Sequence, residues 1–189
     1  MSYRKVIIFS APSGSGKTTL IKNLLKQGFP LKFSKSACTR KKRKNEKEGK
    51  DYHFLSINEF KQKITENAFI EWEEVYENMF YGTLKSEVEK IWASGNCIIF
   101  DVDVVGGIKL KNLFKNNALA IFVSPPSIKT LIKRLKNRAT ESEENLEKRT
   151  KKIHEELKMK DAFDIIIVNE KLETSFEETT KHVKKFLAL

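Results

Sequence analysis

The sequence predicts an α/β fold in which a parallel β-sheet core is flanked by helices. Four apolar runs of strand length, rich in β-branched residues, recur along the chain at 6–9, 97–100, 119–123 and 165–168. Continuous apolar runs are typical of parallel strands that are covered on both faces. The stretches between them carry apolar residues at helical intervals, so we expect crossover helices to join the strands.

The bulk composition indicates one globular domain. With 189 residues, 40% of them hydrophobic, the chain is long enough to bury a core without disulfides. Cys38 and Cys97 have no CxxC spacing and no histidine cluster beside them, which argues against a disulfide framework or a zinc site. We find no signal peptide and no membrane-spanning run, so we expect a soluble cytoplasmic protein without a membrane partner.

The net charge of +11 points to an anionic partner. Nucleic acids and free nucleotides are both polyanions that fit this requirement, and part of the excess can be a solvated, lysine-rich surface. The sequence carries no stacking-aromatic motif and no recognition-helix signature. We therefore expect no specific nucleic-acid partner.

The first predicted strand leads into a Gly/Ser-rich loop and then into a helix over 17–27, which ends at Gly28. The loop at 11–18, APSGSGKT, nearly matches the phosphate-binding pattern G-x-x-x-x-G-K-[ST]. The match departs at Ala11, where the pattern has glycine, but this position lies at the strand end and we expect little damage. An ordinary Gly/Ser turn is the alternative, and the flanking strand and helix disfavour it.

The residue types in this loop suit a triphosphate. Gly14 and Gly16 let backbone N–H groups turn inward onto phosphate oxygens at a helix N-terminus. Lys17 reaches the β- and γ-phosphates, and the Thr18 hydroxyl can bind Mg²⁺. The loop predicts an α/β nucleotide-binding unit of the P-loop type with ATP and Mg²⁺ as cofactors, and it assigns these residues to ATP binding: Ala11, Pro12, Ser13, Gly14, Ser15, Gly16, Lys17, Thr18 and Thr19.

Residues 34–83 differ from the rest, with half-polar alternating stretches around a short helix that starts at a Ser56–Glu59 capping box. They predict a small mixed β/α insertion. Downstream, Ser127 can cap one helix, a second capping box over 140–143 precedes a charged helix to about Lys158, and apolar spacing predicts a last helix from Leu172.

The order of further motifs resembles the guanylate kinases, from about residue 9 to residue 169. The segments are SACTRKKR at 36–43, GKDYHF at 49–54, FIEW at 69–72, FYGT at 80–83, DVD at 101–103, an arginine-bearing stretch at 134–149, and VN at 168–169. The resemblance implies a P-loop kinase fold in a single domain, with a core at 1–33, 84–124 and 155–189, a GMP-binding subdomain at 34–83 and a helical lid at 125–154.

The resemblance also implies a GMP site. Arg40, Arg43, Tyr52 and Tyr81 are assigned to its phosphate, Glu71 and Asp103 accept from guanine N1–H and the 2-amino group, and Ser36 and Thr83 donate to O6. Taken singly, each of these residues is more often a surface or packing residue, so the assignment depends on their joint order. Asp101 stands at the carboxyl end of a core strand, where ligands of an open α/β sheet gather. It can hold a magnesium-bound water or orient an arginine of the phosphate site, and capping of the strand end is the alternative.

For the lid, the resemblance implies that Arg134, Arg138 and Arg149 contact the triphosphate in the closed state. Asn169 is assigned to ATP binding. The residues assigned to catalysis are Lys17, Arg43, Arg138 and Arg149.

Three features depart from the family pattern. The segment between Glu71 and Tyr81 is one residue longer than expected, which leaves Phe80 and Tyr81 as rivals for the phosphate contact; Tyr81 is preferred because it directly precedes Gly82. Val105 stands where the family usually has glutamine, and Ala139 where glycine is common.

The resulting prediction is a guanylate kinase that uses ATP to phosphorylate GMP, and also dGMP, to GDP in purine nucleotide metabolism. As a monomer or a homodimer, it would have only small-molecule nucleotides as partners. Two alternatives stay open: a catalytically silent scaffold of the same fold, and a related P-loop kinase with another phosphorylated acceptor.

Overall fold

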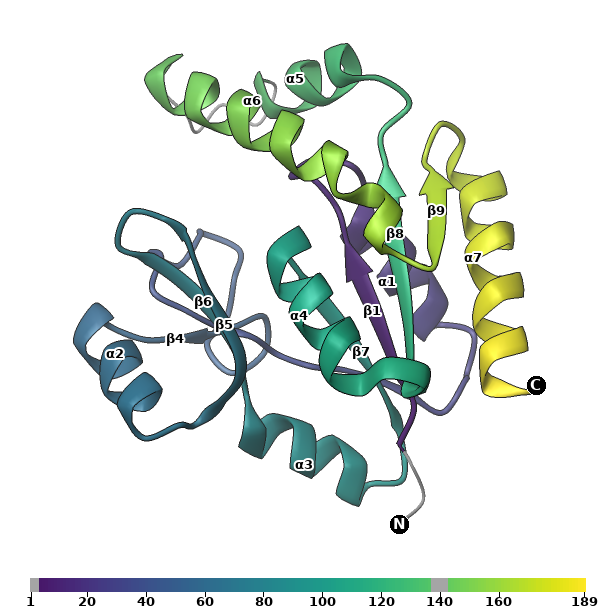
Figure 1. The fold of residues 1–189 in the computed structure, drawn as a ribbon, viewed down its shortest axis with the longest axis horizontal. Helices are drawn as coiled ribbons and strands as arrows, with labels where there is room; N and C mark the ends of the chain where they lie inside the picture. Colours follow the sequence, from purple (N-terminus) through teal and green to yellow (C-terminus); the bar gives the residue numbers. More distant parts are fainter. Residues whose placement is uncertain (1–3, 137–142) are drawn as a thin grey trace.

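The computed structural model describes residues 4–136 and 143–189, with side chains at 4–133 and 149–189. In these residues, five parallel strands form the central sheet in the order β2-β7-β1-β8-β9 (Figure 1). The strands are β1 (Val6–Ser10), β2 (Leu31–Phe33), β7 (Cys97–Val102), β8 (Ala118–Ser124) and β9 (Ile165–Val168). The predicted parallel core is confirmed. The edge strand β2 was not predicted, because three residues are too few to show a periodicity.

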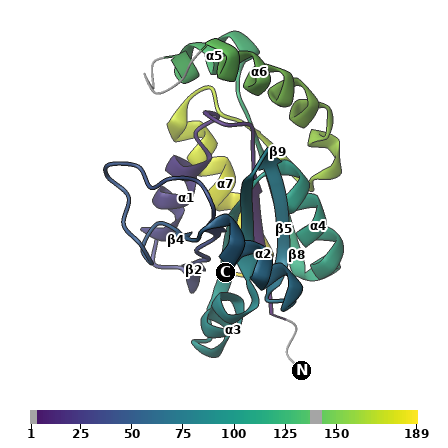
Figure 2. The same cartoon turned by 90° about the vertical axis from the view of Figure 1, so that its left-hand side faces the viewer.

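Helices cover both faces of the sheet. The covering helices are α1 (Lys17–Leu25) and α7 (Leu172–Leu187) on one face, and α3 (Lys85–Ala93) and α4 (Val104–Phe114) on the other. Figure 2 shows α1 and α7 to the left of the sheet and α4 to the right. Two short 3₁₀ helices, Lys115–Asn117 and Lys160–Ala162, precede β8 and β9.

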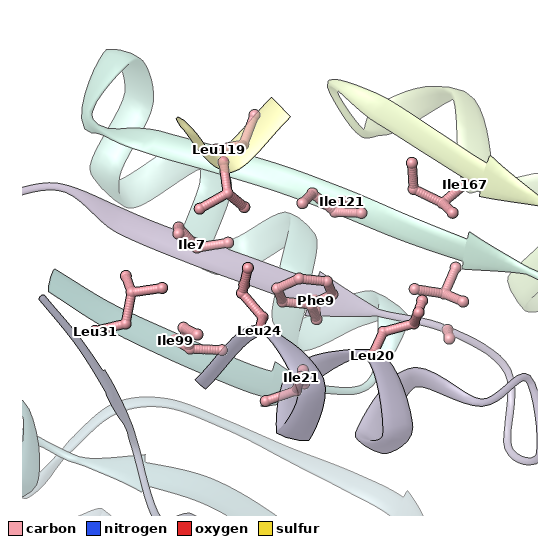
Figure 3. Packing of buried hydrophobic residues seen from close by; sticks show 13 residues of the cluster. Ile7, Phe9, Leu20, Ile21, Leu24, Leu31, Ile99, Leu119, Ile121 and Ile167 are labelled. Atoms are coloured by element: carbon pink, nitrogen blue, oxygen red, sulfur yellow. The ribbon is translucent and has the colours of Figure 1, made fainter. Parts of the chain in front are cut away.

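Strand β1 explains why the predicted strands read as unbroken apolar runs. Ile7 and Phe9 pack into the cluster beneath α1, among Leu20 and Leu24 (Figure 3), whereas Val6 and Ile8 belong to the cluster on the opposite face. All five residues of β1 are buried. Because both faces are covered, the side chains of this strand are apolar up to Ser10 at its carboxyl end, where the Ser10 hydroxyl donates to Asp103 O.

The insertion forms a second sheet of mixed direction, in the order β4-β3-β6-β5. It consists of β3 (Ala37–Cys38), β4 (His53–Phe54), α2 (Ile57–Thr65), β5 (Phe69–Tyr76) and β6 (Met79–Leu84). The capping box that starts α2 is confirmed, since the Ser56 hydroxyl accepts from Glu59 N and the Glu59 carboxylate accepts from Ser56 N. Phe60 stacks on Phe69 at 4.4 Å between ring centroids, which gives the insertion a small core of its own.

Helices α5 (Ile128–Lys136) and α6 (Glu143–Lys158) lie across the carboxyl ends of the strands (Figure 1). Thr130 N donates to the Ser127 hydroxyl, which confirms the predicted cap of α5, and α6 ends at Lys158 as expected. Residues 140–142 of the second predicted capping box lie outside the described part of the chain. Among the described helices, none combines the length and the apolar character that crossing a membrane requires.

Candidate active site

A cavity of about 320 Å³ opens at the carboxyl ends of β1 and β7. Ser10 pairs with Val102 at the end of these strands, so the loop after β1 and the residues after β7 meet at one edge of the sheet. The insertion and α6 contribute the remaining walls. The predicted residues that line the cavity are Ala11, Pro12, Ser13, Gly14, Ser15, Gly16, Lys17, Thr18, Thr19, Ser36, Arg40, Arg43, Tyr52, Glu71, Tyr81, Asp101, Asp103 and Arg149.

The loop between β1 and α1 has the backbone of an anion site. Gly14 and Gly16 have φ angles of 92° and 95°, in the left-handed region that favours glycine. A Cβ at Gly16 would also collide with the side-chain amide of Asn169. That amide donates to Ser15 O at 2.7 Å. Asn169, predicted to contact ATP, therefore supports the loop from behind and does not line the cavity.

Lys17 and Thr18 at the start of α1 both contact Asp101. Lys17 Nζ lies 2.6 Å from Asp101 Oδ1 and donates to Val102 O at 2.6 Å. The Thr18 hydroxyl donates to Asp101 Oδ2 at 3.2 Å. Thr18 and Asp101 thus bring together two hard oxygen donors of the kind that Mg²⁺ takes.

Glu71 is buried at the position predicted for guanine. Strands β5 and β6 form an antiparallel hairpin, in which Glu71 on β5 pairs with Thr83 on β6. The Thr83 hydroxyl donates to Glu71 Oε1 at 2.6 Å. Burial raises the pKa of Glu71 to about 7, and the nearby charge of Asp103 adds to this shift, while the Thr83 hydrogen bond opposes it. Thr83 is fully buried and does not line the cavity, so its hydrogen bond to guanine O6 stays a prediction.

The two carboxylate oxygens of Asp103 differ in their contacts. Its Oδ1 accepts from Gly106 N at 2.9 Å and caps α4. Its Oδ2 is buried without a hydrogen-bond partner. A Cβ at Gly106 would stand 2.9 Å from both Asp103 Oδ1 and Glu71 Oε2, so glycine lets the two carboxylates approach this turn of the helix. Val105, which departs from the family pattern, is half-buried in the same turn and has no role that we can assign.

Arg40 is the more ordered of the two arginines assigned to the GMP phosphate. Its two terminal nitrogens each donate to a Glu46 carboxylate oxygen at 2.6 Å, and its guanidinium lies 4.8 Å from the Tyr52 ring centroid. These hydrogen bonds lower the pKa of Glu46. Arg43 is 62% exposed at its side chain and approaches Glu46 to 3.8 Å. Ser36 is buried nearby and lines the same cavity.

The hairpin places Tyr81 in the cavity and Phe80 in the core of the insertion. Phe80 is 5% exposed and packs 5.5 Å from Phe60, whereas Tyr81 meets Tyr52 edge-on at 6.2 Å. This arrangement supports the preference for Tyr81. The pairing of β5 with β6 shifts register between Glu74 and Tyr76, where an additional residue can be absorbed.

Of the predicted lid arginines, the structure describes the side chain of Arg149 alone. Arg149 lies on α6, lines the cavity, and holds its guanidinium 5.8 Å from the Tyr76 ring centroid. Arg134 belongs to α5, but its side chain is not among those described. Arg138 and Ala139 lie outside the described residues.

Lys152 and Glu156 on α6 are charged cavity residues that the sequence interpretation missed. The signal was present, since positions 149, 152, 153 and 156 lie on one face of a helix. This pattern was not recognised because charged residues occur along the whole helix, and a charged helix face is usually exposed to solvent.

Comparison with known proteins gives consistent matches along the chain. Residues 3–188 match the family model described as "Guanylate kinase". The chain is 50% identical over 185 residues to a guanylate kinase of Bacteroides fragilis, covering 98% of this chain and 91% of the relative. It is 46% identical to one of Porphyromonas gingivalis, covering 97% and 98%. A crystal structure of guanylate kinase from Anaplasma phagocytophilum superimposes with a TM-score of 0.79 at 29% identity, covering 97% of this chain and 86% of that one.

Proposed function

The chain belongs to the guanylate kinase family, and from this premise we propose that it transfers the γ-phosphoryl group of ATP to GMP. One observation carries the choice of acceptor. Glu71 and Asp103 bring buried carboxylate oxygens together beside a phosphate loop, within one cavity. Guanine presents two adjacent donors, N1–H and the 2-amino group, which such a pair of acceptors satisfies.

The acceptor atom needs no general base, because a GMP phosphate oxygen is already anionic at neutral pH. Catalysis then consists of aligning two polyanions that repel each other and screening the charge between them. Each residue at the phosphates is proposed to contribute to one of these two tasks.

Lys17 and Arg40 retain donors for phosphate after their protein contacts are counted. The Lys17 ammonium has three N–H donors, of which Asp101 and Val102 O take two. The Arg40 guanidinium has five, of which Glu46 and Lys41 O take three. Glu46 therefore fixes the orientation of Arg40 and leaves N–H groups for the GMP phosphate, with Arg43, Tyr52 and Tyr81 as the other proposed contacts.

Thr18 is proposed to hold Mg²⁺ together with the ATP phosphates, and Asp101 to hold it through water. The ion would supply positive charge at the β- and γ-phosphates. Arg149, with Arg134 and Arg138, is proposed to neutralise the triphosphate when the lid closes and excludes water. The proposal extends to dGMP, because the assigned groups contact the base and the phosphate and not the sugar.

The two alternatives make different demands on the site. A silent scaffold has no need of a phosphate loop with two left-handed glycines and a lysine, and all of these are in place. A kinase for another phosphorylated acceptor, such as a sugar, has no need of the Glu71 and Asp103 pair.

ADP release in a coupled assay with AMP, GMP, CMP or UMP as acceptor separates these possibilities. We expect turnover with GMP. AMP is discriminated by about 10⁴ or more, because adenine N1 and its 6-amino group leave buried polar groups unpaired at about 1–3 kcal/mol each. Turnover of none of the four would favour the scaffold, or a different acceptor if a phosphorylated sugar then releases ADP.

The role of Glu71 has its own test. Glu71→Ala should lower kcat/KM for GMP by orders of magnitude and that for AMP, already poor, very little. Glu77→Ala, in the exposed turn of the same hairpin, is the matched control and should change neither. An equal loss for both nucleotides in Glu71→Ala would mean that Glu71 is structural.

A further inference from the structure

Helix α6 presents one face to the cavity. Lys152, Ile153 and Glu156 line it together with Arg149, at helical spacing. Ile153 is buried and packs with Leu131 of α5, which ties the two lid helices together. Lys152 and Glu156, one turn apart, are charged residues of the lid that the proposed phosphate chemistry does not use.

Lys152 connects the lid to the insertion. Its Nζ donates to Val75 O at 3.2 Å and lies 5.2 Å from the centroid of the Tyr76 ring. Both partners belong to β5, the strand that carries Glu71. The contact joins residues 77 positions apart and links α6 with the hairpin.

The same ammonium lies between two carboxylates. Lys152 Nζ is 3.7 Å from Asp103 Oδ2, the oxygen without a hydrogen-bond partner, and 3.9 Å from Glu156 Oε1. Glu156 is 6% exposed. Burial raises its pKa to about 7, with Asp103 adding to the shift and Lys152 and Lys17 opposing it. The Lys152 charge therefore offsets repulsion between a lid residue and a residue of the guanine pocket.

We propose that Lys152 is a positioning residue that couples closure of the α6 lid to occupation of the guanine pocket. It reaches three segments at once: its own helix through Glu156, the guanine-binding hairpin through Val75 O, and the end of β7 through Asp103. These contacts can form together only while α6 lies over the hairpin. A ligand that orders the hairpin and Asp103 therefore favours the closed lid, and a nucleotide that closes the lid favours the GMP site by the same factor.

The inference rests on the proposed function, since it takes Asp103 and the hairpin as the GMP site. Its measure is a coupling factor: the ratio of the GMP dissociation constant alone to that in saturating Mg²⁺ and β,γ-imido-ATP, a non-hydrolysable ATP analogue. Calorimetry gives both constants. The variants are Lys152→Met, which keeps the length of the side chain, and Lys152→Arg, which keeps its charge. Lys151→Met, exposed on the same helix, is the matched control.

For wild type we expect a coupling factor of about five or more, the range typical of allosteric coupling. Lys152→Met should bring the factor close to one while GMP affinity without the analogue changes less than about threefold, and kcat should fall. Lys152→Arg should restore part of the factor, and Lys151→Met should match wild type. Glu156→Gln, which removes the counter-charge on the same helix, should lower the factor in the direction of Lys152→Met.

Three results would overturn the inference: a wild-type factor of one, an undiminished factor in Lys152→Met, or an equal loss of GMP affinity with and without the analogue. The last would make Lys152 a part of the pocket and not a coupling residue. GMP turnover by wild type is measured first. Its absence would refute the proposed function and the inference with it, whereas turnover without coupling refutes the inference alone.

Discussion

At the scale of single residues, the ammonium group of Lys17 is positioned by β7 itself. Asp101 and Val102 O hold the ammonium at the phosphate loop. These two contacts fix the orientation of a side chain that would otherwise be flexible. A lysine fixed in this way loses little conformational entropy when it meets a phosphate.

Replacing Lys17 by alanine should therefore abolish detectable phosphoryl transfer while the fold survives. The charge that screens the transferring group is lost, and Asp101 loses its cation. Lys22→Ala, on the exposed side of the same helix, should keep wild-type activity. ADP release and a thermal melt report on activity and fold. A kcat of a tenth of wild type or more in Lys17→Ala would refute the loop assignment.

The protonation of Glu71 should make GMP binding depend on pH. Its pKa is raised to about 7 by burial, and guanine donors favour the charged form, so binding releases a proton. GMP affinity should rise with pH up to about 7 and level off above it, with a limiting slope of about tenfold per pH unit. The second ionisation of the GMP phosphate, near pH 6, acts in the same direction.

Glu71→Gln separates these two contributions, because the phosphate titrates in both proteins. Calorimetry of GMP binding in two buffers of different ionisation enthalpy counts the protons released. The wild type should release more near neutral pH, by up to about one proton. An identical proton count in both proteins would show that Glu71 binds GMP without changing its charge.

Some residues of the candidate site could be predicted from the sequence, and others could not. Lys17, Arg40, Glu71 and Asp103 stand in short motifs whose spacing is itself informative, and the structure brings them to one cavity. Lys152 belongs to no motif. Its proposed role depends on an approach to Val75 O and Asp103 that only the folded chain creates.

At the scale of elements, the first turn of α4 packs against the two carboxylates that are proposed to bind the base. Gly106 lies where any side chain would press on Asp103 Oδ1 and Glu71 Oε2. Helix α4 was not delimited from the sequence, because its start is small and apolar and carries no periodic polar face. The capped helix α2 and the long helix α7 were predicted, since cap and period agreed.

Gly106→Ala should raise KM for GMP about tenfold, as the loss of one hydrogen bond would. The added methyl group displaces the two carboxylates, while the helix itself tolerates alanine well. KM for ATP should stay unchanged, because the phosphate loop is not touched. Val105→Ala in the same turn is the control, and steady-state kinetics with each substrate varied in turn is the measurement. Equal effects on both substrates would indicate a general distortion of the core.

At the scale of the whole molecule, the two proposed substrate sites meet at one edge of the central sheet. The apolar runs were sufficient to predict a parallel core, because burial on two faces leaves a plain signal. How the insertion and helices α5 and α6 meet above that edge could not be predicted from the sequence, since it depends on contacts between segments that are far apart, such as Lys152 and Val75.

The net charge of +11 also acts at this scale. It should speed the encounter with anionic nucleotides, so kcat/KM for GMP should fall about threefold or more when salt rises from about 50 to about 200 mM. Sucrose at matched osmolality should have no such effect. Retention on duplex DNA should be weak and vanish over the same salt range. Tight, sequence-selective DNA binding at physiological salt would contradict the view that the charge serves nucleotides alone.

The divided carboxylate of Asp103 restricts how base preference can evolve. One oxygen caps α4 and the other is proposed to accept from the base, so most replacements would lose a helix cap, worth about 0.5–2 kcal/mol, together with the proposed base contact. Serine and threonine keep a capping oxygen but have no second polar group for the base, whereas asparagine keeps a capping oxygen and adds a donor where an acceptor stood. A change of base preference at this position therefore passes most readily through asparagine, toward a base with a carbonyl at position 2.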